Sequence, residues 1–313
     1  MTDQRPVAII GAGLVGSGWA LVFARAGYDV NVYDPVAEVR HRVLPWARES
    51  LAELAHVGLV DQPEATLARI TVHDQLPLAV AGAFYIQESV FETVAAKTEV
   101  SLQIDALMAA DAVVGSSSSG IPASQFTEGC AHRARFVVAH PVNPPHLVPV
   151  VEIVPSPWTD PAVVDLASDL MGHVGQVPVR LTREIDGFVL NRLQGALLNE
   201  AWALYQDGIA SLADIDATIS QGLGLRWSFM GPFETIDLNA PGGIEDYAVR
   251  LRELYAGMAR NPPPGPWSDD LIARVTAERR AALPKDRLAE RRAWRDGILG
   301  RLLAFKKSNR LAD

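Results

Sequence analysis

Cysteine is almost absent from this chain, and so is any sign of export. The single cysteine, Cys130, cannot form an internal disulfide, which is typical of proteins in a reducing compartment. Residues 7–10 form too short an apolar run for the core of a signal peptide, and they lead directly into a glycine turn. We therefore expect a cytoplasmic protein.

Basic charge and long apolar runs are also missing. The formal net charge is −9, so we expect neither nucleic acid nor an anionic membrane as a partner, because both require a basic surface. The longest apolar stretch, around residues 78–86, is well short of the ~20 residues that span a bilayer. Neither an HExxH motif nor a Cys/His cluster with ligand spacing occurs, so no metal is expected.

The composition is that of an ordinary folded protein, with 49% hydrophobic and 21% charged residues in 313 positions. In the first part of the chain, short apolar runs alternate with longer stretches of helical spacing. Strands are expected at residues 7–10, 30–34, 69–72, 83–87, 112–115 and 136–139. This alternation predicts an α/β fold with a doubly wound, mostly parallel sheet, the Rossmann architecture, over residues 1–184.

Residues 185–313 lack this alternation and predict a smaller, all-helical second domain. Asp186 can cap a long helix that ends near Gly208. The apolar residues of this helix recur at helical spacing and are Leu190, Leu193, Leu197, Ala201 and Leu204. Many proteins bury such a stripe against a second subunit, so we expect a homodimer through this domain.

The end of the second domain contains a proline-rich stretch and a basic stretch. Residues 261–266 predict a rigid loop. The C-terminal stretch is basic enough to suit nucleic acid, but its basic residues lie mostly off an apolar stripe. That stripe consists of Trp294, Ile298, Leu302 and Phe305. The arrangement favours a docked helix with a solvated basic face.

A glycine-rich turn follows the first expected strand. A bare GxGxxG is a weak signal, but here a strand precedes it, a helix follows it, and the next strand ends in Asp34. The glycines allow the tight turn and the approach of a pyrophosphate, and the helix N-terminus offers free N–H groups. Residues that would contact the cofactor in this turn are Gly11, Gly13, Leu14, Val15 and Gly16.

Asp34 decides between the two nicotinamide dinucleotides. Its carboxylate can accept hydrogen bonds from the adenosine ribose and would repel a 2′-phosphate, and residues 35–38 supply no arginine in compensation. We therefore favour NAD over NADP. A glycine turn inside some other α/β protein is the alternative.

Residues 140–152 form a second candidate motif. The apolar run 136–139 ends at His140, and Glu152 lies inside the apolar run 148–153. Burying a carboxylate is costly unless it has a partner, and His140 is a good candidate. The pair is either a general base oriented by a carboxylate or a hydrogen-bonded core histidine beside a structural acid. Taken alone, the stretch favours the second interpretation.

Polar residues follow two other expected strands at their carboxyl ends, where open α/β sheets bind ligands. Residues 88–92 follow one strand, and the serine run 116–119 follows another. The serines are either a polar turn before a helix that begins at Pro122 or, for at least one of them, contacts to a substrate. Asn191 lies near the start of the long helix, close to the end of the sheet domain.

Several long segments together resemble the 3-hydroxyacyl-CoA dehydrogenase superfamily over nearly the whole chain. Within it, the likeness is greatest to the branch of lambda-crystallin and L-gulonate 3-dehydrogenase. The segments that carry the resemblance are YIQESV (85–90), VAHPVNPP (138–145), GFVLNRLQ (187–194), EAW (200–202), GLGLRW (222–227), GPFET (231–235) and RRAWRD (291–296). Their number and their order make the likeness specific.

The resemblance implies roles for individual residues. It makes His140 the catalytic base with Glu152 as its carboxylate partner, Ser119 and Asn191 the residues that hold the reacting oxygen, and Asp34, Glu92 and Lys97 contacts to NAD. The family's usual Ser-Asn-Thr-Ser-Ser is Ser-Ser-Ser-Ser-Gly at residues 116–120 here. This departure keeps Ser119 but leaves Gly120 without a hydroxyl.

By this resemblance we expect NAD-dependent oxidation of the 3-hydroxyl of a small L-3-hydroxy acid, such as L-gulonate. Arg226 lies where acyl-CoA members commonly have small or aromatic residues, and a guanidinium suits a free carboxylate. Pairing of Arg226 with an acid at an interface is an equal alternative.

Two other functions are weighed against this one. The first is an L-3-hydroxyacyl-CoA (3-hydroxybutyryl-CoA) dehydrogenase that uses the same catalytic residues. The second is a non-catalytic, crystallin-like NAD-binding protein, against which the complete set of catalytic residues counts.

Overall fold

A computed structural model describes residues 4–258 and 266–309, so residues 261–265 of the expected proline-rich loop lie outside the described part. The chain forms two compact units, Met1–Arg192 with Asp296–Ala304, and Leu193–Arg295 with Phe305–Asp313. The first unit continues past residue 184 because the turn at Phe188 is buried in it.

A single sheet forms the centre of the first unit, and its strand order in the described residues is β3-β2-β1-β4-β5-β6-β7-β8. All neighbouring strands pair in parallel except β6 and β7, which pair antiparallel. The strands are β1 (Val7–Ile10), β2 (Val30–Tyr33), β3 (Ile70–His73), β4 (Tyr85–Glu88), β5 (Val113–Ser116), β6 (Phe136–Pro141), β7 (Val150–Pro155) and β8 (Val177–Arg180). This architecture confirms the predicted mostly parallel sheet.

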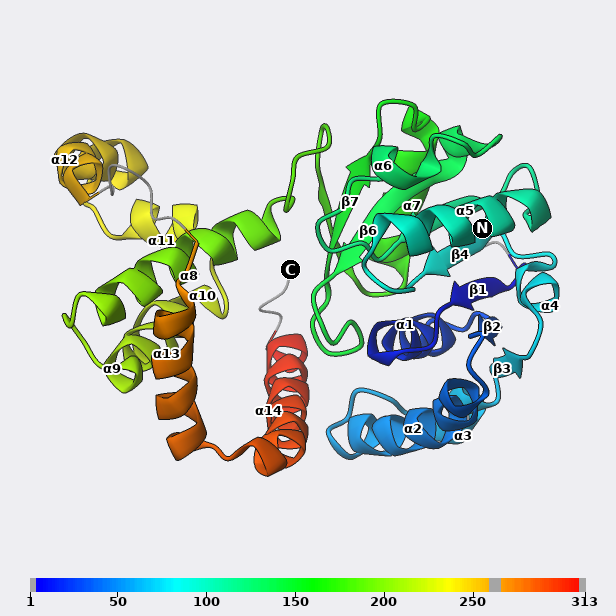
Figure 1. The fold of residues 1–313 in the computed structure, drawn as a ribbon, viewed down its shortest axis with the longest axis horizontal. Coiled ribbons are helices and arrows are strands. Elements are labelled where there is room, and N and C mark those ends of the chain that lie inside the picture. The colour runs from blue at the N-terminus through cyan, green and yellow to red at the C-terminus, as the bar shows by residue number, and fades with distance from the viewer. Residues whose placement is uncertain (1–3, 259–265, 310–313) are drawn as a thin grey trace. The chain divides into compact units, whose positions relative to one another are not determined.

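Helices cover both faces of the sheet, as Figure 1 shows. On one face pack α1 (Leu14–Arg25), α2 (Ala37–His56), α3 (Pro63–Leu67) and α7 (Pro161–His173), around a core that includes Trp19 and Phe23. On the other face pack α4 (Leu76–Val80) and α5 (Val94–Leu107), around Ile86 and Ile104. The central strands β1 and β4 are buried throughout, as expected of parallel strands between two helical layers. The remaining short helices of this unit are α6 (Ser124–Thr127) and η1 (Arg133–Arg135).

The second unit is helical in its described residues, as predicted. Its helices are most of α8 (Leu190–Gln206), then α9 (Leu212–Ala217), η2 (Thr218–Leu223), α10 (Gly224–Trp227), α11 (Pro232–Leu238), α12 (Gly243–Met258), α13 (Asp269–Ala282), η3 (Lys285–Arg287) and parts of α14 (Leu288–Ser308). Within the described part of this unit, Leu271 is the one apolar side chain that is fully buried. No helix in the described ranges combines the length and the apolarity needed to cross a membrane.

The C-terminal helix α14 docks through a different face from the one predicted. The expected stripe of Trp294, Ile298, Leu302 and Phe305 is 39–56% exposed. A neighbouring line on residues 296–304, the part of α14 that belongs to the first unit, packs inside that unit instead. The cluster contains Leu299, Leu303 and Ala304 from α14, with Leu54, Leu59 and Leu147. The prediction of the buried face was wrong because α14 carries two apolar lines, and periodicity alone does not show which one meets a partner.

Candidate active site

The glycine turn joins β1 to α1 with the geometry that a dinucleotide needs. Gly11 has a φ of +93°, and a Cβ on Gly16 would lie 1.8 Å from the carbonyl oxygen of Gly11, so only glycine fits there. A Cβ on Gly13 would meet nothing within 4 Å, so the backbone is open where a pyrophosphate would approach. Helix α1 begins at the exposed Leu14, followed by the half-buried Val15, and directs its N-terminus to this space.

Asp34 lies at the end of β2, directly beside the glycine turn. Its Oδ2 accepts a hydrogen bond from the N–H of Ala12 at 2.9 Å, and its Oδ1 accepts one from the N–H of Val36 at 2.9 Å. The guanidinium of Arg40 donates to the carbonyl oxygens of Asp34 and Pro35 at 2.7 and 3.1 Å. This arginine lies just beyond residues 35–38, in the first turn of α2, so the sequence analysis did not include it.

A pocket of about 460 Å³ opens between the glycine turn and α2. It is lined by Gly13 and Leu14 from the turn and by residues of α2 that include His41, Arg42 and Trp46. The pocket and the guanidinium of Arg42 therefore lie beside the loop that would hold the phosphates. With the open face of Gly13 and the carboxylate of Asp34, the residues present fit NAD.

The strand pair β6 and β7 places His140 opposite Glu152 in register. Both side chains are buried, and His140 Nδ1 lies 2.8 Å from Glu152 Oε2. The other carboxylate oxygen, Oε1, accepts hydrogen bonds from the N–H groups of Val189 and Leu190 at 2.8 and 2.9 Å. Every oxygen of this buried carboxylate therefore has a donor.

The hydrogen bonds decide the charge of Glu152. Burial by itself would raise the pKa of this carboxyl, but the bonds from His140 and from the N–H groups of Leu190 and Val189 outweigh it and lower the pKa below its ordinary value. An ionised carboxylate only accepts hydrogen bonds, so His140 must carry its proton on Nδ1. In the neutral imidazole, Nε2 then holds the free lone pair that a general base requires.

The same carboxylate replaces the predicted cap of the long helix. Helix α8 begins at Leu190, and the acceptor for its first N–H groups is Glu152. The prediction that Asp186 caps this helix was therefore wrong. The chain reverses between the two positions, with positive φ angles at Gly187 and Phe188.

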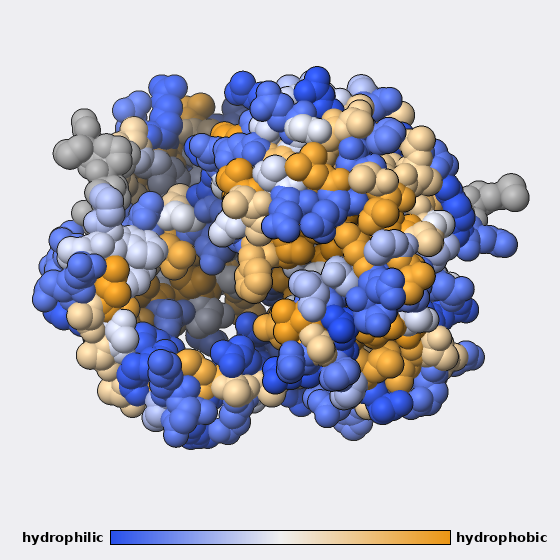
Figure 2. Space-filling view, turned by 45° about the vertical axis from the view of Figure 1, so that its right-hand side comes forward, coloured by the Kyte–Doolittle hydropathy of each residue, from blue (hydrophilic) through white to orange (hydrophobic). Residues whose placement is uncertain are grey.

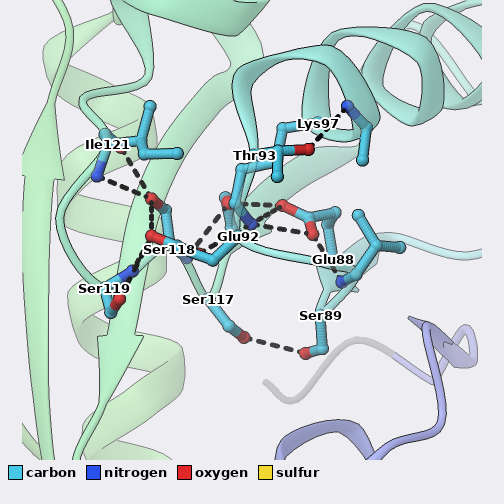
Figure 3. A network of polar contacts seen from close by, with 12 residues as sticks. Glu88, Ser89, Glu92, Thr93, Lys97, Ser117, Ser118, Ser119 and Ile121 are labelled. Carbon is cyan, nitrogen blue, oxygen red and sulfur yellow. Dashed lines mark hydrogen bonds and ion pairs between the residues drawn. The ribbon is translucent and has the colours of Figure 1, made fainter.

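A second network gathers at the ends of β4 and β5, where Glu92 lies against the serine loop (Figure 3). Glu92 Oε1 accepts hydrogen bonds from Ser118 Oγ at 3.0 Å, from the N–H and Oγ of Ser119 at 2.7 and 3.1 Å, and from the N–H of Gly120 at 3.1 Å. From the other side, Asn191 Nδ2 donates to the carbonyl oxygen of Ser119. Gly120 lacks the family's hydroxyl, but its N–H still contributes to the loop.

Lys97 connects this loop to a buried acid that the sequence analysis did not select. Lys97 Nζ lies 3.1 Å from both carboxylate oxygens of Glu88 and 3.4 Å from Glu92 Oε2. Glu88 also accepts hydrogen bonds from Ser116 Oγ at 2.5 Å and from the N–H of Val90 at 2.7 Å. A glutamate at the end of a buried strand, nine positions before a lysine on a helix, was the available signal.

The environment of Glu92 keeps it charged as well. Burial would raise its pKa, but the charge of Lys97 and the hydrogen bonds from Ser119, Ser118 and Gly120 lower it. Lys97 itself is completely buried, so the predicted contact between its ammonium and NAD stays a prediction, as does that of Glu92. His140, Glu152, Ser119, Asn191, Glu92 and Lys97 all belong to the first unit.

Models of two protein domains match consecutive parts of this chain. The NAD-binding domain of 3-hydroxyacyl-CoA dehydrogenase matches residues 6–185, and the C-terminal domain of the same enzyme matches residues 187–280. The chain belongs to the 3-hydroxyacyl-CoA dehydrogenase family. The resemblance found in the sequence is thereby confirmed, and NAD is the cofactor of its first domain.

Individual members of the family differ in their named substrates. The chain is 42% identical over 306 residues to the lambda-crystallin homolog of Bos taurus, covering 96% of this chain and 95% of that protein. It is 40% identical over 243 residues to the L-carnitine dehydrogenase of Streptomyces griseus subsp. griseus, covering 77% and 72%. Among solved structures it is similar to 5-formyl-3-hydroxy-2-methylpyridine 4-carboxylic acid 5-dehydrogenase, with a TM-score of 0.77, 28% identity, and coverage of 92% and 99%.

Arg226 belongs to the second unit, whereas both networks belong to the first. It belongs to α10 of the second unit, and its side chain is exposed. Among the described residues it forms no ion pair, so the alternative of an acid partner receives no support from within the chain. Its predicted contact with a substrate carboxylate stays a prediction.

Proposed function

We propose that this protein is an NAD-dependent dehydrogenase that oxidises the 3-hydroxyl of a small L-3-hydroxy acid with a free carboxylate, such as L-gulonate. The observation that carries the proposal is the buried pair of His140 and Glu152, with 2.8 Å between Nδ1 and Oε2. An ionised Glu152 fixes the tautomer of His140, which is the state in which an imidazole accepts a proton.

The reaction uses the protein's groups in a defined order. NAD, when bound, supplies the acceptor for the hydride that leaves the carbinol carbon. His140 Nε2 removes the hydroxyl proton in the same step, and Glu152 stabilises the imidazolium that forms. Ser119 Oγ and Asn191 Nδ2 would donate to the reacting oxygen. Both groups have partners within the protein, Glu92 and the carbonyl oxygen of Ser119, so substrate binding would exchange those bonds.

Two observations favour a free acid over a thioester. Arg226 presents an exposed guanidinium without a described acid partner, and a guanidinium binds a carboxylate through two parallel hydrogen bonds. The L-carnitine dehydrogenase that is 40% identical to this chain is named for a 3-hydroxy acid with a free carboxylate. The family's own description favours the alternative, an L-3-hydroxyacyl-CoA substrate.

Arg226→Met tests the choice of substrate. We expect the Michaelis constant for the free acid to rise by about 10-fold or more, because the charged pair is lost, with little change for a CoA thioester. The exposed Arg252 on α12 offers a matched control, and Arg252→Met should leave both constants unchanged. An unchanged constant for the free acid in Arg226→Met would remove Arg226 from substrate binding.

We also propose a homodimer through the second unit. Its helices leave large apolar side chains exposed, among them Leu193 and Leu197 of the predicted stripe and Phe233. Figure 2 shows apolar residues reaching the surface on the face drawn. A unit that buries so few apolar side chains of its own is stabilised when a partner covers them. Sedimentation of Leu193→Glu against wild type tests this, and an unchanged dimer would contradict it.

One assay separates the candidate functions. NADH formation is followed with L-gulonate, L-carnitine, L-3-hydroxybutyrate and L-3-hydroxybutyryl-CoA at equal concentrations. We expect the highest kcat/KM with a free acid. The highest value with the thioester would establish the acyl-CoA alternative, and NAD binding without turnover on any substrate would support the non-catalytic one.

A further inference from the structure

We propose that Phe188 is a positioning residue that holds both members of the His140–Glu152 pair in place. Its ring is completely buried, and its centroid lies 5.7 Å from that of the His140 imidazole, with 55° between the ring planes. Its backbone has a φ of +51°. The catalytic part of this inference rests on the proposed function, whereas its structural part does not.

The backbone of Phe188 positions the N–H groups that donate to Glu152. Gly187 and Phe188 have φ angles of +74° and +51°, two successive residues in the left-handed region. A bulky L-residue rarely adopts this conformation and keeps it only where the surrounding structure enforces it. The consequence here is a sharp reversal after which the N–H groups of Val189 and Leu190 lie 2.8 and 2.9 Å from Glu152 Oε1. The turn therefore brings the first turn of α8 onto the carboxylate.

The side chain of Phe188 packs beside the imidazole of His140. Its ring belongs to an apolar cluster that includes Val138 on β6 and Val154 on β7. Val138 is two positions before His140, and Val154 is two positions after Glu152, so these residues share the sheet face of the pair. The ring thus closes the site beside the imidazole, limits its rotation and keeps water from the bond between Nδ1 and Oε2. Both effects preserve the alignment that proton transfer requires.

Phe126 provides a matched control. It belongs to the same apolar cluster and is 2% exposed, so its loss removes a buried ring of the same kind. Its backbone φ is not positive, and among the described residues the centroid of its ring lies 5.9 Å from Lys97 Nζ and its ring makes no contact with the His140 ring. A purely structural role for Phe188 predicts that Phe188→Leu and Phe126→Leu behave alike.

The experiment compares these two variants by activity, by NAD affinity and by proton NMR. We expect Phe188→Leu to lower kcat by about 10- to 100-fold, the range expected for a misplaced catalytic group, with the dissociation constant for NAD nearly unchanged. The strongly hydrogen-bonded Nδ1 proton of His140, identified by its loss in His140→Gln, should broaden or vanish. Phe126→Leu should lower the melting temperature to a similar degree while keeping both kcat and this resonance.

Gly187→Ala tests the turn separately from the ring. An added Cβ would meet Asn191 Cβ at 3.6 Å and Arg192 Cγ at 3.7 Å, ordinary contacts, so the substitution acts only through the left-handed backbone. We expect it to lower kcat as Phe188→Leu does. It also keeps the inference testable if Phe188→Leu does not fold.

The outcomes are distinguishable. Retention of kcat and of the His140 resonance in Phe188→Leu and Gly187→Ala would overturn the inference, as would equal losses in Phe126→Leu. If wild type turns over none of the substrates, the proposed function fails, and the resonance alone still decides whether Phe188 positions the pair.

Discussion

Glu152 and Glu92 are two ionised carboxylates in the same unit, and they are stabilised in different ways. Glu152 has a side chain that is 2% exposed, and its donors are an imidazole and two backbone N–H groups. The side chain of Glu92 is 39% exposed, and Lys97 balances its charge while the serine loop donates hydrogen bonds. The pKa of each carboxyl is lowered. For Glu152 the main cause is hydrogen bonding, and for Glu92 it is the charge of Lys97 together with hydrogen bonds from the serine loop.

From this difference we expect the Glu152 network to react and the Glu92 network to support the serine loop. The imidazole of His140 is the one partner of either carboxylate that is suited to accept a proton, so we expect the Glu152 network to take up charge during a reaction. The ammonium of Lys97 is held between two carboxylates, which suits a fixed support for the loop of Ser118 to Gly120. Four substitutions test this difference between the two networks.

His140→Ala removes the reactive member of the Glu152 network. We expect NAD affinity near that of wild type and a turnover lower by ~10²–10⁴-fold, the usual size of general-base catalysis. Steady-state rates and fluorescence titration with NADH measure the two quantities. Turnover near the wild-type value would exclude His140 from the mechanism.

Lys97→Met removes the cation of the Glu92 network instead. It leaves Glu88 and Glu92 close together without their shared cation, and removal of one partner from a buried ion pair costs about 3–5 kcal/mol of folding free energy. Urea unfolding measures the loss. The exposed Lys285→Met is the control, with no expected change. Equal midpoints for the two variants would show that the buried lysine does not stabilise the fold.

Asp34→Ser extends the comparison to a carboxylate that has only backbone donors. The substitution removes the negative charge that would repel a 2′-phosphate, while the guanidinium of Arg40 stays beside this position on the carbonyl oxygens of residues 34 and 35. We expect the preference for NAD over NADP to fall by about tenfold or more in kcat/KM. Adding Arg40→Met should abolish the gain with NADP. An unchanged preference in Asp34→Ser would show that other residues select the cofactor.

Glu152→Gln tests the charge of Glu152 through the pH dependence of the melting temperature. Because the pKa of Glu152 is lowered from its ordinary value of 4.5, the ionised carboxylate stabilises the fold fully above that pH. The contribution is lost as the pH falls through the lowered value. The melting temperature of wild type should therefore exceed that of Glu152→Gln at neutral pH, and the gap should narrow in acid. A gap that is constant or widens in acid would contradict the assigned pKa shift.

The sheet could be predicted because its information is local. Runs such as residues 7–10 and the GxGxxG turn contain their own signals, and the mostly parallel arrangement follows from the alternation of elements. The pairing of His140 with Glu152 could be inferred because a buried acid needs a nearby partner, and only 12 positions separate the two residues.

The missed features depend on contacts between distant positions. Glu152 caps a helix 38 positions later, so the nearer Asp186 was the natural choice from sequence alone. Periodicity does not distinguish the two apolar lines of α14. Packing against the surface that contains Leu54 and Leu59 determines which line is buried. Arg40 acts through backbone carbonyls, and no residue pattern marks such contacts.

A crystal structure of the complex with NAD and a 3-hydroxy acid would test the central claim most directly. We expect His140 Nε2 to lie within about 2.6–3.2 Å of the 3-hydroxyl oxygen, with Nδ1 still bonded to Glu152. A hydroxyl that lies out of reach of this imidazole, with another acceptor beside it, would contradict the account.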